Sequence, residues 1–108
     1  MDAAALARAY YRRIDDGAYD ALREVLADSF VHDRPDRTLE GPDRFVRFMR
    51  EDRPLTNTTH VISIACADDS TAVAEGVLED GDGERLFAFV DVFACADSTI
   101  TEIRTYTD

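Results

Sequence analysis

The sequence predicts a single α+β domain, spanning residues 1–108, in which helices come first and a β-sheet follows. Its 108 residues suffice for one modest hydrophobic core. Apolar residues recur three and four positions apart in the first half of the chain and alternate with a period of two in the second half. Helices followed by a meander of strands are typical of α+β domains.

Three helices are expected in the first half. The first ends at the Asp-Asp-Gly of residues 15–17, where Gly17 suits a left-handed cap. Its apolar face carries Ala3, Leu6, Ala7, Tyr10 and Ile14. The second is predicted at about residues 19–28, followed by a short extended segment and a loop. The third begins at Pro42, because proline suits the first helical position, and Pro54 marks its limit.

Four long strands are expected in the second half, and the Asp-Gly-Asp-Gly of residues 80–83 is a strong hairpin signal. The last strand has Ile100 and Ile103 three positions apart, which breaks strict alternation and predicts a bulge. The strands are predicted within residues 59–67, 71–79, 85–96 and 99–108.

The strand at residues 85–96 is apolar on both faces. An antiparallel sheet that packs on one side only alternates apolar with polar residues. The predicted helices can cover one face of this strand, and so short a chain leaves little to cover the other. We therefore expect a symmetric homodimer in which sheet packs on sheet.

The composition is strongly acidic, with a formal net charge of −11 and no lysine among its 12 basic residues. This pattern resembles that of proteins from salt-loaded cytoplasms, where screening weakens repulsion between carboxylates. Nucleic acid is not an expected partner, because phosphate binding needs clustered cations. The sequence contains neither an apolar run long enough to span a membrane nor a secretory signal, so a cytoplasmic protein without membrane contact is expected.

The cysteines and histidines show no spacing typical of metal ligands, so neither a metal nor another cofactor is expected. Cys66 and Cys95 are interpreted as small buried hydrophobic residues. His60 shares a strand face with apolar residues and is interpreted as a core histidine. His32 precedes Asp33, and adjacent strand residues point to opposite faces, so the two are not expected to share a pocket.

A family resemblance extends over nearly the whole chain. The segments AYYRRIDDGAYDALREVLADSFVHD, LEGPDRFVRFM and FVDVFACADSTITEIRTYTD resemble the nuclear-transport-factor-two-like superfamily. Within it, the chain is most similar to small SnoaL-like and ketosteroid-isomerase-like proteins. The resemblance implies a cone-shaped α+β barrel, in which N-terminal helices pack on a curved antiparallel sheet around a pocket for a small hydrophobic molecule.

The resemblance also implies three catalytic residues. By analogy with ketosteroid isomerases, Asp91 would stay protonated and donate a hydrogen bond to a developing oxyanion, Tyr10 would donate beside it, and Asp33 would carry the proton. The implied activity is cofactor-independent acid–base chemistry of the isomerase or cyclase type on a small carbonyl compound. The expected substrate-binding residues are Ile14, Phe30, Phe45, Met49, Phe87, Phe89 and Phe93.

The residues by themselves leave alternatives open. A buried carboxylate at Asp91 must be protonated, hydrogen-bonded or paired, so it is either a pocket acid or a structural residue bonded to Tyr10, Tyr106 or Arg104. Asp33 also fits a solvated turn. The alternative function is a non-catalytic ligand-binding or dimerisation module. Convergence of Asp91, Tyr10 and Asp33 on one cavity would favour the enzyme.

Overall fold

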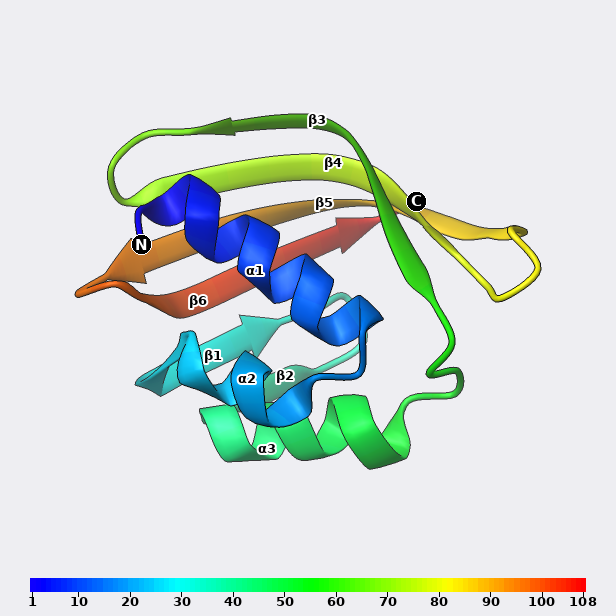
Figure 1. The fold of residues 1–108 in the computed structure, drawn as a ribbon, viewed down its shortest axis with the longest axis horizontal. Coiled ribbons are helices and arrows are strands. Elements are labelled where there is room, and N and C mark those ends of the chain that lie inside the picture. The colour runs from blue at the N-terminus through cyan, green and yellow to red at the C-terminus, as the bar shows by residue number, and fades with distance from the viewer.

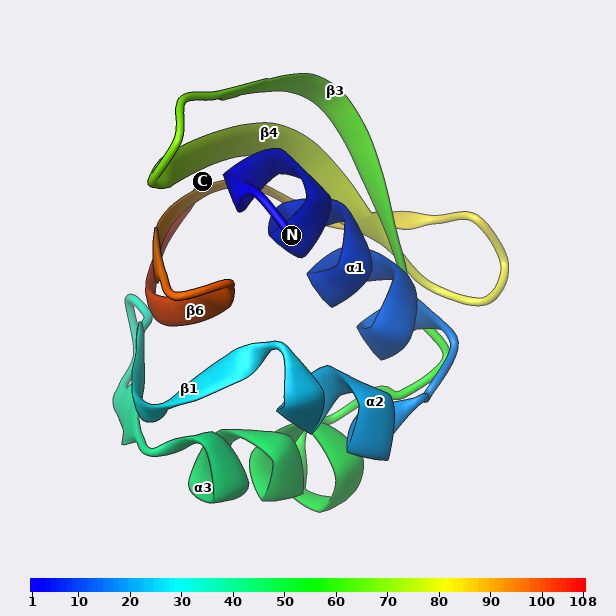
Figure 2. The same cartoon turned by 60° about the vertical axis from the view of Figure 1, so that its left-hand side comes forward.

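The computed structural model describes residues 1–63 and 65–108, and it has the predicted α+β architecture. In chain order the elements are α1 (Ala3–Asp15), α2 (Tyr19–Glu24), β1 (Leu26–Asp33), β2 (Thr38–Glu40), α3 (Pro42–Arg47), the π-helical η1 (Phe48–Asp52), β3 (Thr59–Ala67), β4 (Thr71–Glu79), β5 (Arg85–Ala96) and β6 (Thr99–Thr107). The sheet is strongly curved, with α1 along its concave side and α2 and α3 at its β1–β2 end, which gives the cone shape (Figures 1 and 2).

Helix α1 follows the predicted apolar periodicity and packs along the concave side of the sheet. Asp2 caps its start by accepting a hydrogen bond of 2.8 Å from the Ala5 amide. Gly17 follows its end at a φ of +67°, which is the left-handed conformation expected there. Tyr10 and Ile14 lie on its buried face, and Tyr11 is buried as well.

The second helix is shorter than predicted, because β1 begins at Leu26 rather than after residue 28. Leu26 pairs with Ile100 of β6, and the Ile100 amide donates a hydrogen bond of 2.8 Å to the Val25 carbonyl. Sheet pairing therefore overrides the local helical pattern at residues 26–28. The predicted third helix is confirmed from Pro42, continues as η1, and gives way to extended backbone at Arg53.

The sheet has the strand order β2-β1-β6-β5-β4-β3 and is open rather than closed into a barrel. The expectation of a wholly antiparallel sheet is wrong at one position, since β1 and β6 are parallel. No hairpin joins these two strands, so nothing forces them to run in opposite directions. The predicted bulge in β6 is confirmed, because Ala94 pairs with Glu102 while the next residue, Cys95, pairs with Ile100.

Strand β3 forms one edge of the sheet and is irregular. Its register with β4 shifts between Ile62 and Ile64, where a Cβ added to Gly76 would lie 2.2 Å from the Val61 carbonyl oxygen. Cys66 lies beyond this shift and pairs with Val73. It is exposed, which corrects the expectation of a buried thiol, while Cys95 is half-buried.

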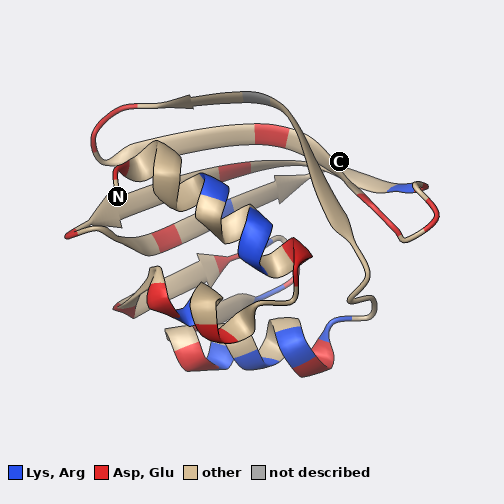
Figure 3. Cartoon of the chain, in the orientation of Figure 1, with Lys and Arg blue, Asp and Glu red and all other residues tan. Residues whose placement is uncertain are grey.

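The hydrophobic core fills the space between α1, α3 and the concave face of the sheet. Its largest fully buried side chains are Phe30, Phe45, Phe93, Leu6, Ile14, Leu22, Leu39, Ile100 and Ile103. Charged residues concentrate on the helices and turns, and the strands carry few of them (Figure 3). In the part of the chain that the structure describes, no helix has the length and apolar character needed to cross a membrane.

Candidate functional site

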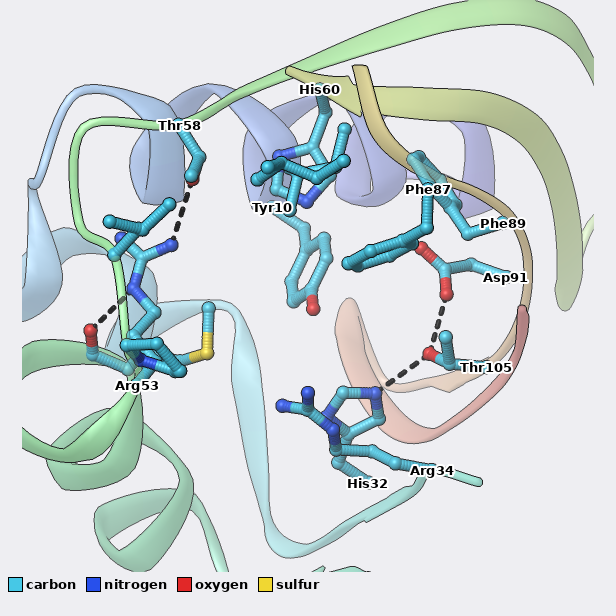
Figure 4. A pocket seen from close by; sticks show the side chains of 15 residues that line it. Tyr10, His32, Arg34, Arg53, Thr58, His60, Phe87, Phe89, Asp91 and Thr105 are labelled. Atoms are coloured by element: carbon cyan, nitrogen blue, oxygen red, sulfur yellow. Dashed lines mark hydrogen bonds between the residues drawn. The ribbon is translucent and has the colours of Figure 1, made fainter. Parts of the chain in front are cut away.

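A cavity of about 190 Å³ lies inside the cone, at the end where β5 and the loop before β3 approach α1 (Figure 4). This is smaller than the roughly 300–1,000 Å³ typical of sites for drug-sized ligands, so it suits a smaller molecule. One part of its wall is apolar and contains Met49, Pro54, Leu55, Leu78, Leu86, Phe87 and Phe89. The polar part contains Tyr10, His32, Arg34, Arg53, Thr58, His60, Asp91 and Thr105.

Asp91 lies in this cavity wall, on the concave face of β5, and is only 5% exposed. Tyr11 Oη donates a hydrogen bond of 2.7 Å to its Oδ2, and Thr105 Oγ1 donates one of 2.5 Å to its Oδ1. Burial raises the pKa of the Asp91 carboxyl, although these two hydrogen bonds oppose the rise. Asp91 is therefore a buried acid with both of its oxygens held in place.

His32 extends this network across the cavity. Its Nε2 lies 2.8 Å from Thr105 Oγ1, so Thr105 connects the imidazole to the Asp91 carboxyl (Figure 4). Burial, aided by the nearby charge of Arg34, lowers the pKa of His32 to about 3, which keeps the ring neutral at physiological pH. The other ring nitrogen, Nδ1, is buried and has no hydrogen-bond partner among the described residues.

The adjacent residues Tyr10 and Tyr11 have different roles. The Tyr10 hydroxyl points into the middle of the cavity and makes no hydrogen bond to another described residue (Figure 4). Tyr11 instead uses its hydroxyl to hold Asp91. Burial and the proximity of Asp91 raise the pKa of both hydroxyls, so both remain neutral donors.

His60 lies in the same cavity wall and is held by a carboxylate at the end of α1. Its Nδ1 is 2.6 Å from Asp15 Oδ1, and its backbone amide donates a hydrogen bond of 3.0 Å to Asp15 Oδ2. The ring also contacts the rings of Tyr11 and Phe89, with centroid separations of 5.0 and 5.5 Å. The carboxylate thus fixes the orientation of the imidazole from outside the cavity.

Two arginines give the cavity a positive side. Arg53 is committed to structure, since it donates hydrogen bonds to the Met49 carbonyl, Thr58 and Tyr19. Arg34 lies beside His32 (Figure 4), and its Nε is 3.3 Å from Asp36 Oδ1. Its positive charge lowers the pKa of His32 and opposes the rise at Tyr10 and Asp91. Arg34 is therefore placed to stabilise negative charge in the cavity.

The structure brings two of the three expected catalytic residues together. Asp91 and Tyr10 line the cavity, whereas Asp33 is exposed at the end of β1 and accepts a hydrogen bond of 3.3 Å from Thr38. The alternation of β1 explains this, because His32 points inward and its neighbour Asp33 points outward. Convergence of all three on one cavity, the condition that would favour the enzyme, is thus not met, because Asp33 lies outside the cavity wall.

The expected substrate-binding residues divide in the same way. Met49, Phe87 and Phe89 line the cavity. The other four are 0% exposed and lie outside its wall, since they pack between the helices and the sheet as core residues: Ile14, Phe30, Phe45 and Phe93. They support the cavity from behind and do not contact its contents.

Sequence reasoning missed several residues of the polar wall. His60 was expected in the core, and no local pattern predicts its pairing with Asp15, which lies 45 positions away. His32 could have been found, because the period of two places it on the same inward face as Phe30. Thr105 gives no comparable signal. Across the residues that the structure describes, no three side chains of the metal-binding types gather in one place.

Comparison with known proteins identifies the family. A model of the SnoaL-like domain matches residues 7–103, so the chain belongs to this family. No curated protein matches the chain significantly.

Solved structures with low sequence identity share the fold. A candidate ketosteroid isomerase from Kribbella flavida is 23% identical, with a TM-score of 0.85 over 96% of this chain and 76% of that protein. A candidate polyketide cyclase from Xanthomonas campestris is 23% identical, with a TM-score of 0.83 over 98% and 90%. An LEH-like epoxide hydrolase from M. tuberculosis is 22% identical, with a TM-score of 0.81 over 95% and 80%. These likenesses establish the fold alone.

Proposed function

We propose that this SnoaL-like domain binds a small carbonyl compound in its cavity and catalyses cofactor-independent proton transfer of the isomerase or cyclase type. The observation that carries the proposal is the convergence on one cavity of a buried acid, Asp91, and of Tyr10, a neutral donor with no partner in the described part of the chain. Perturbed titratable groups gathered in a cavity are typical of active sites. The names of the similar structures support the same class of chemistry.

In this proposal Tyr10 stabilises the oxygen of the reacting carbonyl. Its hydroxyl is free to donate to an oxygen placed in the cavity, and the charge of Arg34 favours negative charge developing there. Asp91 accepts the proton. Its raised pKa moves the carboxyl toward the range in which a general base works efficiently near neutral pH. Protonated Asp91 then returns the proton to the enolate carbon, and the Asp15–His60 pair supplies a second acid–base group in the same cavity wall.

This assignment differs from the roles that the family resemblance implies. In the roles implied by the resemblance, Asp91 donates a hydrogen bond to the oxyanion and Asp33 carries the proton. Here both oxygens of Asp91 already accept hydrogen bonds, from Tyr11 and Thr105, which favours the carboxylate as an acceptor. Asp33 lies outside the cavity and has no role in the proposal.

Hydrogen–deuterium exchange of a simple ketone tests the proposal. The probe is 2-cyclohexenone, a small enolisable ketone, incubated with the protein in deuterated buffer and followed by proton NMR. We expect exchange of its acidic C–H groups above the buffer rate. Asp91→Asn should reduce the enzymatic rate at least about 100-fold, and Tyr10→Phe about 10-fold or more, as expected for loss of a base and of an oxyanion donor.

Asp82→Asn serves as the matched control, because Asp82 is an exposed carboxylate in the β4–β5 hairpin turn. It should exchange the probe as the original protein does. Asp33→Asn tests the role implied by the resemblance. If that change abolished exchange while Asp91→Asn left it intact, Asp33 would be the base and the present assignment would be overturned.

One observation favours a second candidate, a non-catalytic binding module. Tyr11 and Thr105 satisfy both oxygens of Asp91, as they would in a purely structural network. The same experiment separates the two functions. A module would bind 2-cyclohexenone, detectable by changes in the NMR spectrum of the protein, without exchanging its protons.

The outer face of the sheet supports a homodimer in this proposal. No described helix covers this face, and Val90 and Val92 of β5 are only partly buried there. Val92 pairs with Val73 of β4, and Val90 pairs with the exposed Glu75. Sheet-to-sheet packing of two copies would bury these valines. Size-exclusion chromatography with light scattering should give a dimer that Val90→Glu with Val92→Glu converts to a monomer. A monomeric parent protein at micromolar concentration would contradict it.

A further inference from the structure

We infer that His32 is a further catalytic residue, which takes a proton from a hydroxyl group of the ligand at Nδ1 and relays it through Thr105 to Asp91. The inference rests on the proposed function and describes a second step, separate from the C–H transfer, in which Asp91 as a carboxylate receives a hydroxyl proton of the ligand. This step requires a ligand with a hydroxyl or enol group beside its carbonyl, whereas 2-cyclohexenone, which has none, probes the C–H transfer alone. Three residues from β1, β6 and β5 form the route (Figure 4).

The hydrogen bonds determine which nitrogen of His32 carries the proton. Thr105 has one hydroxyl proton, which it donates to Asp91 Oδ1 at 2.5 Å. Its oxygen must therefore accept from His32 Nε2, which lies 2.8 Å away. A neutral imidazole carries only one proton, so Nδ1 has a lone pair and acts as an acceptor. The network thus assigns the Nε2–H tautomer to His32.

The free nitrogen of His32 points to a ligand. Buried polar atoms are almost always hydrogen-bonded, and each exception in a native structure calls for a specific explanation. In the described residues, Nδ1 of His32 is the buried side-chain atom that has no partner. His32 is 4% exposed and belongs to the cavity wall. Because Nδ1 is buried, a ligand hydroxyl reaches it only by displacing the atoms that separate it from the cavity, and would then supply the missing donor.

The relay step balances in atoms and charge. The ligand O–H bond breaks, and its proton binds to Nδ1 of His32. The Nε2–H bond breaks in turn, and that proton passes to Thr105 Oγ1, whose original proton moves to Asp91 Oδ1. The ligand gains one negative charge, Asp91 loses one, and both His32 and Thr105 end neutral. The two distances within the protein, 2.8 and 2.5 Å, permit the transfers from Nε2 to Thr105 and from Thr105 to Asp91 without movement of these residues.

The surroundings of the route favour this neutral mechanism. Burial lowers the pKa of His32, so an imidazolium intermediate would be unfavourable, and a relay avoids it. Arg34 lies on the His32 side and would stabilise the oxyanion left on the ligand. The other ionisable groups near the route are Tyr10 and Tyr11 of α1, Asp36 after β1, Arg53 after η1 and His60 of β3.

NMR of the ligand-free protein tests the relay without a substrate. The nitrogen-15 shifts of His32 report which ring nitrogen carries a proton, and the carbon-13 shift of the Asp91 carboxyl reports its titration. At high pH we expect the proton on Nε2. As Asp91 becomes protonated, it should donate to Thr105, Thr105 should donate to Nε2, and the His32 proton should appear on Nδ1. The nitrogen-15 shifts of Nδ1 and Nε2 should therefore swap as the tautomer changes, and the midpoint of this change should equal the pH midpoint of the Asp91 carboxyl titration.

Variants of Thr105 provide the control. Thr105→Val removes the connecting hydroxyl, so the His32 tautomer should stop following Asp91, whereas Thr105→Ser keeps a hydroxyl and should restore the coupling. Thr101→Val is the matched control, because the Thr101 hydroxyl lies on the same strand and binds the Ala94 carbonyl. The relay is overturned if the original protein keeps one His32 tautomer over the whole pH range of the Asp91 titration, or if His32 becomes an imidazolium in that range. It is also overturned if the His32 tautomer still follows Asp91 in Thr105→Val.

A pair of small aromatic probes tests the ligand class. Phenol carries a hydroxyl and toluene lacks one, although their shapes are similar. Phenol should bind and shift the Nδ1 resonance of His32, while toluene should bind at least 10-fold more weakly and leave it unchanged. Equal binding of both probes without a change at Nδ1 would overturn the claim that a ligand hydroxyl binds to this nitrogen. If neither probe bound, the proposed cavity function would fail, independently of the tautomer result.

Discussion

His32 and His60 line the same cavity but control their protons through different partners. His60 contacts a carboxylate directly, at 2.6 Å from Asp15. His32 reaches its carboxylate, Asp91, through the hydroxyl of Thr105, and its Nδ1 has no partner among residues 1–63 and 65–108. The direct contact fixes the His60 ring and gives its Nδ1 a partner. The indirect contact leaves Nδ1 of His32 available as a hydrogen-bond acceptor. Which acceptors a site offers to a ligand therefore depends on how its residues are hydrogen-bonded to one another, as well as on which residues are present.

The largest expected effect is a pH dependence caused by His32. Its pKa falls from the usual 6.5 to about 3 on folding, so acid protonates the unfolded chain first. Stability is therefore fully present above pH 6.5 and is lost as the pH falls toward 3, by up to about 1.4 kcal/mol per pH unit. Urea unfolding of the original protein and of His32→Gln at several pH values measures the difference.

The comparison with His32→Gln is needed because Asp91 acts in the opposite direction. A raised carboxyl pKa means that stability falls as the pH rises through it. The variant removes the contribution of His32 and retains that of Asp91. Parallel stability curves for the two proteins between pH 6.5 and 4 would contradict the neutral, buried state of His32.

The second effect distinguishes the two neighbouring tyrosines. Tyr11→Phe should destabilise the protein by about 1–3 kcal/mol, because it leaves the buried Oδ2 of Asp91 without its donor. Tyr10→Phe should change the free energy of unfolding by less than about 0.5 kcal/mol, since its hydroxyl has no partner among the described residues. Chemical denaturation measures both. Equal losses would show that the Tyr10 hydroxyl has a structural role.

A smaller loss is expected on the His60 side. Asp15→Ala removes hydrogen bonds to both the ring and the amide of His60, and should cost about 1–2 kcal/mol. Part of that loss should be offset, because a carboxylate at the last residue of α1 interacts unfavourably with the helix dipole. Thermal unfolding is the measurement, with the exposed neighbour Asp16→Ala as control. An effect no larger than that of Asp16→Ala would contradict the structural role of the Asp15–His60 contact.

The smallest effect concerns the surface rather than the cavity. At a net charge of −11, raising potassium chloride from about 0.05 to about 1 M shortens the Debye length to about 3 Å. This should screen carboxylate repulsion and stabilise the fold by no more than about 1 kcal/mol. The pH difference caused by His32 should persist in salt, because buried groups are screened much less. Destabilisation by salt would contradict the prediction of a salt-adapted surface.

Much of the fold could be predicted from periodicity, and the exceptions have physical causes. Strands β3 to β6 and the β6 bulge follow from alternation, which requires only local information. The end of α2 and the parallel pairing of β1 could not, because both depend on a strand more than 60 residues away. The same limit applies to the site, where Asp91 could be predicted from its own strand and its connection to His32 through Thr105 could not.

A crystal structure with 2-cyclohexenone tests the central claim most directly. The account predicts the ring inside the cavity against Phe87 and Phe89, with its carbonyl oxygen about 2.7 Å from the Tyr10 hydroxyl. Tyr10→Phe should weaken this binding. A ketone bound only elsewhere on the molecule, or one inside the cavity whose oxygen makes no contact with Tyr10, would contradict the account.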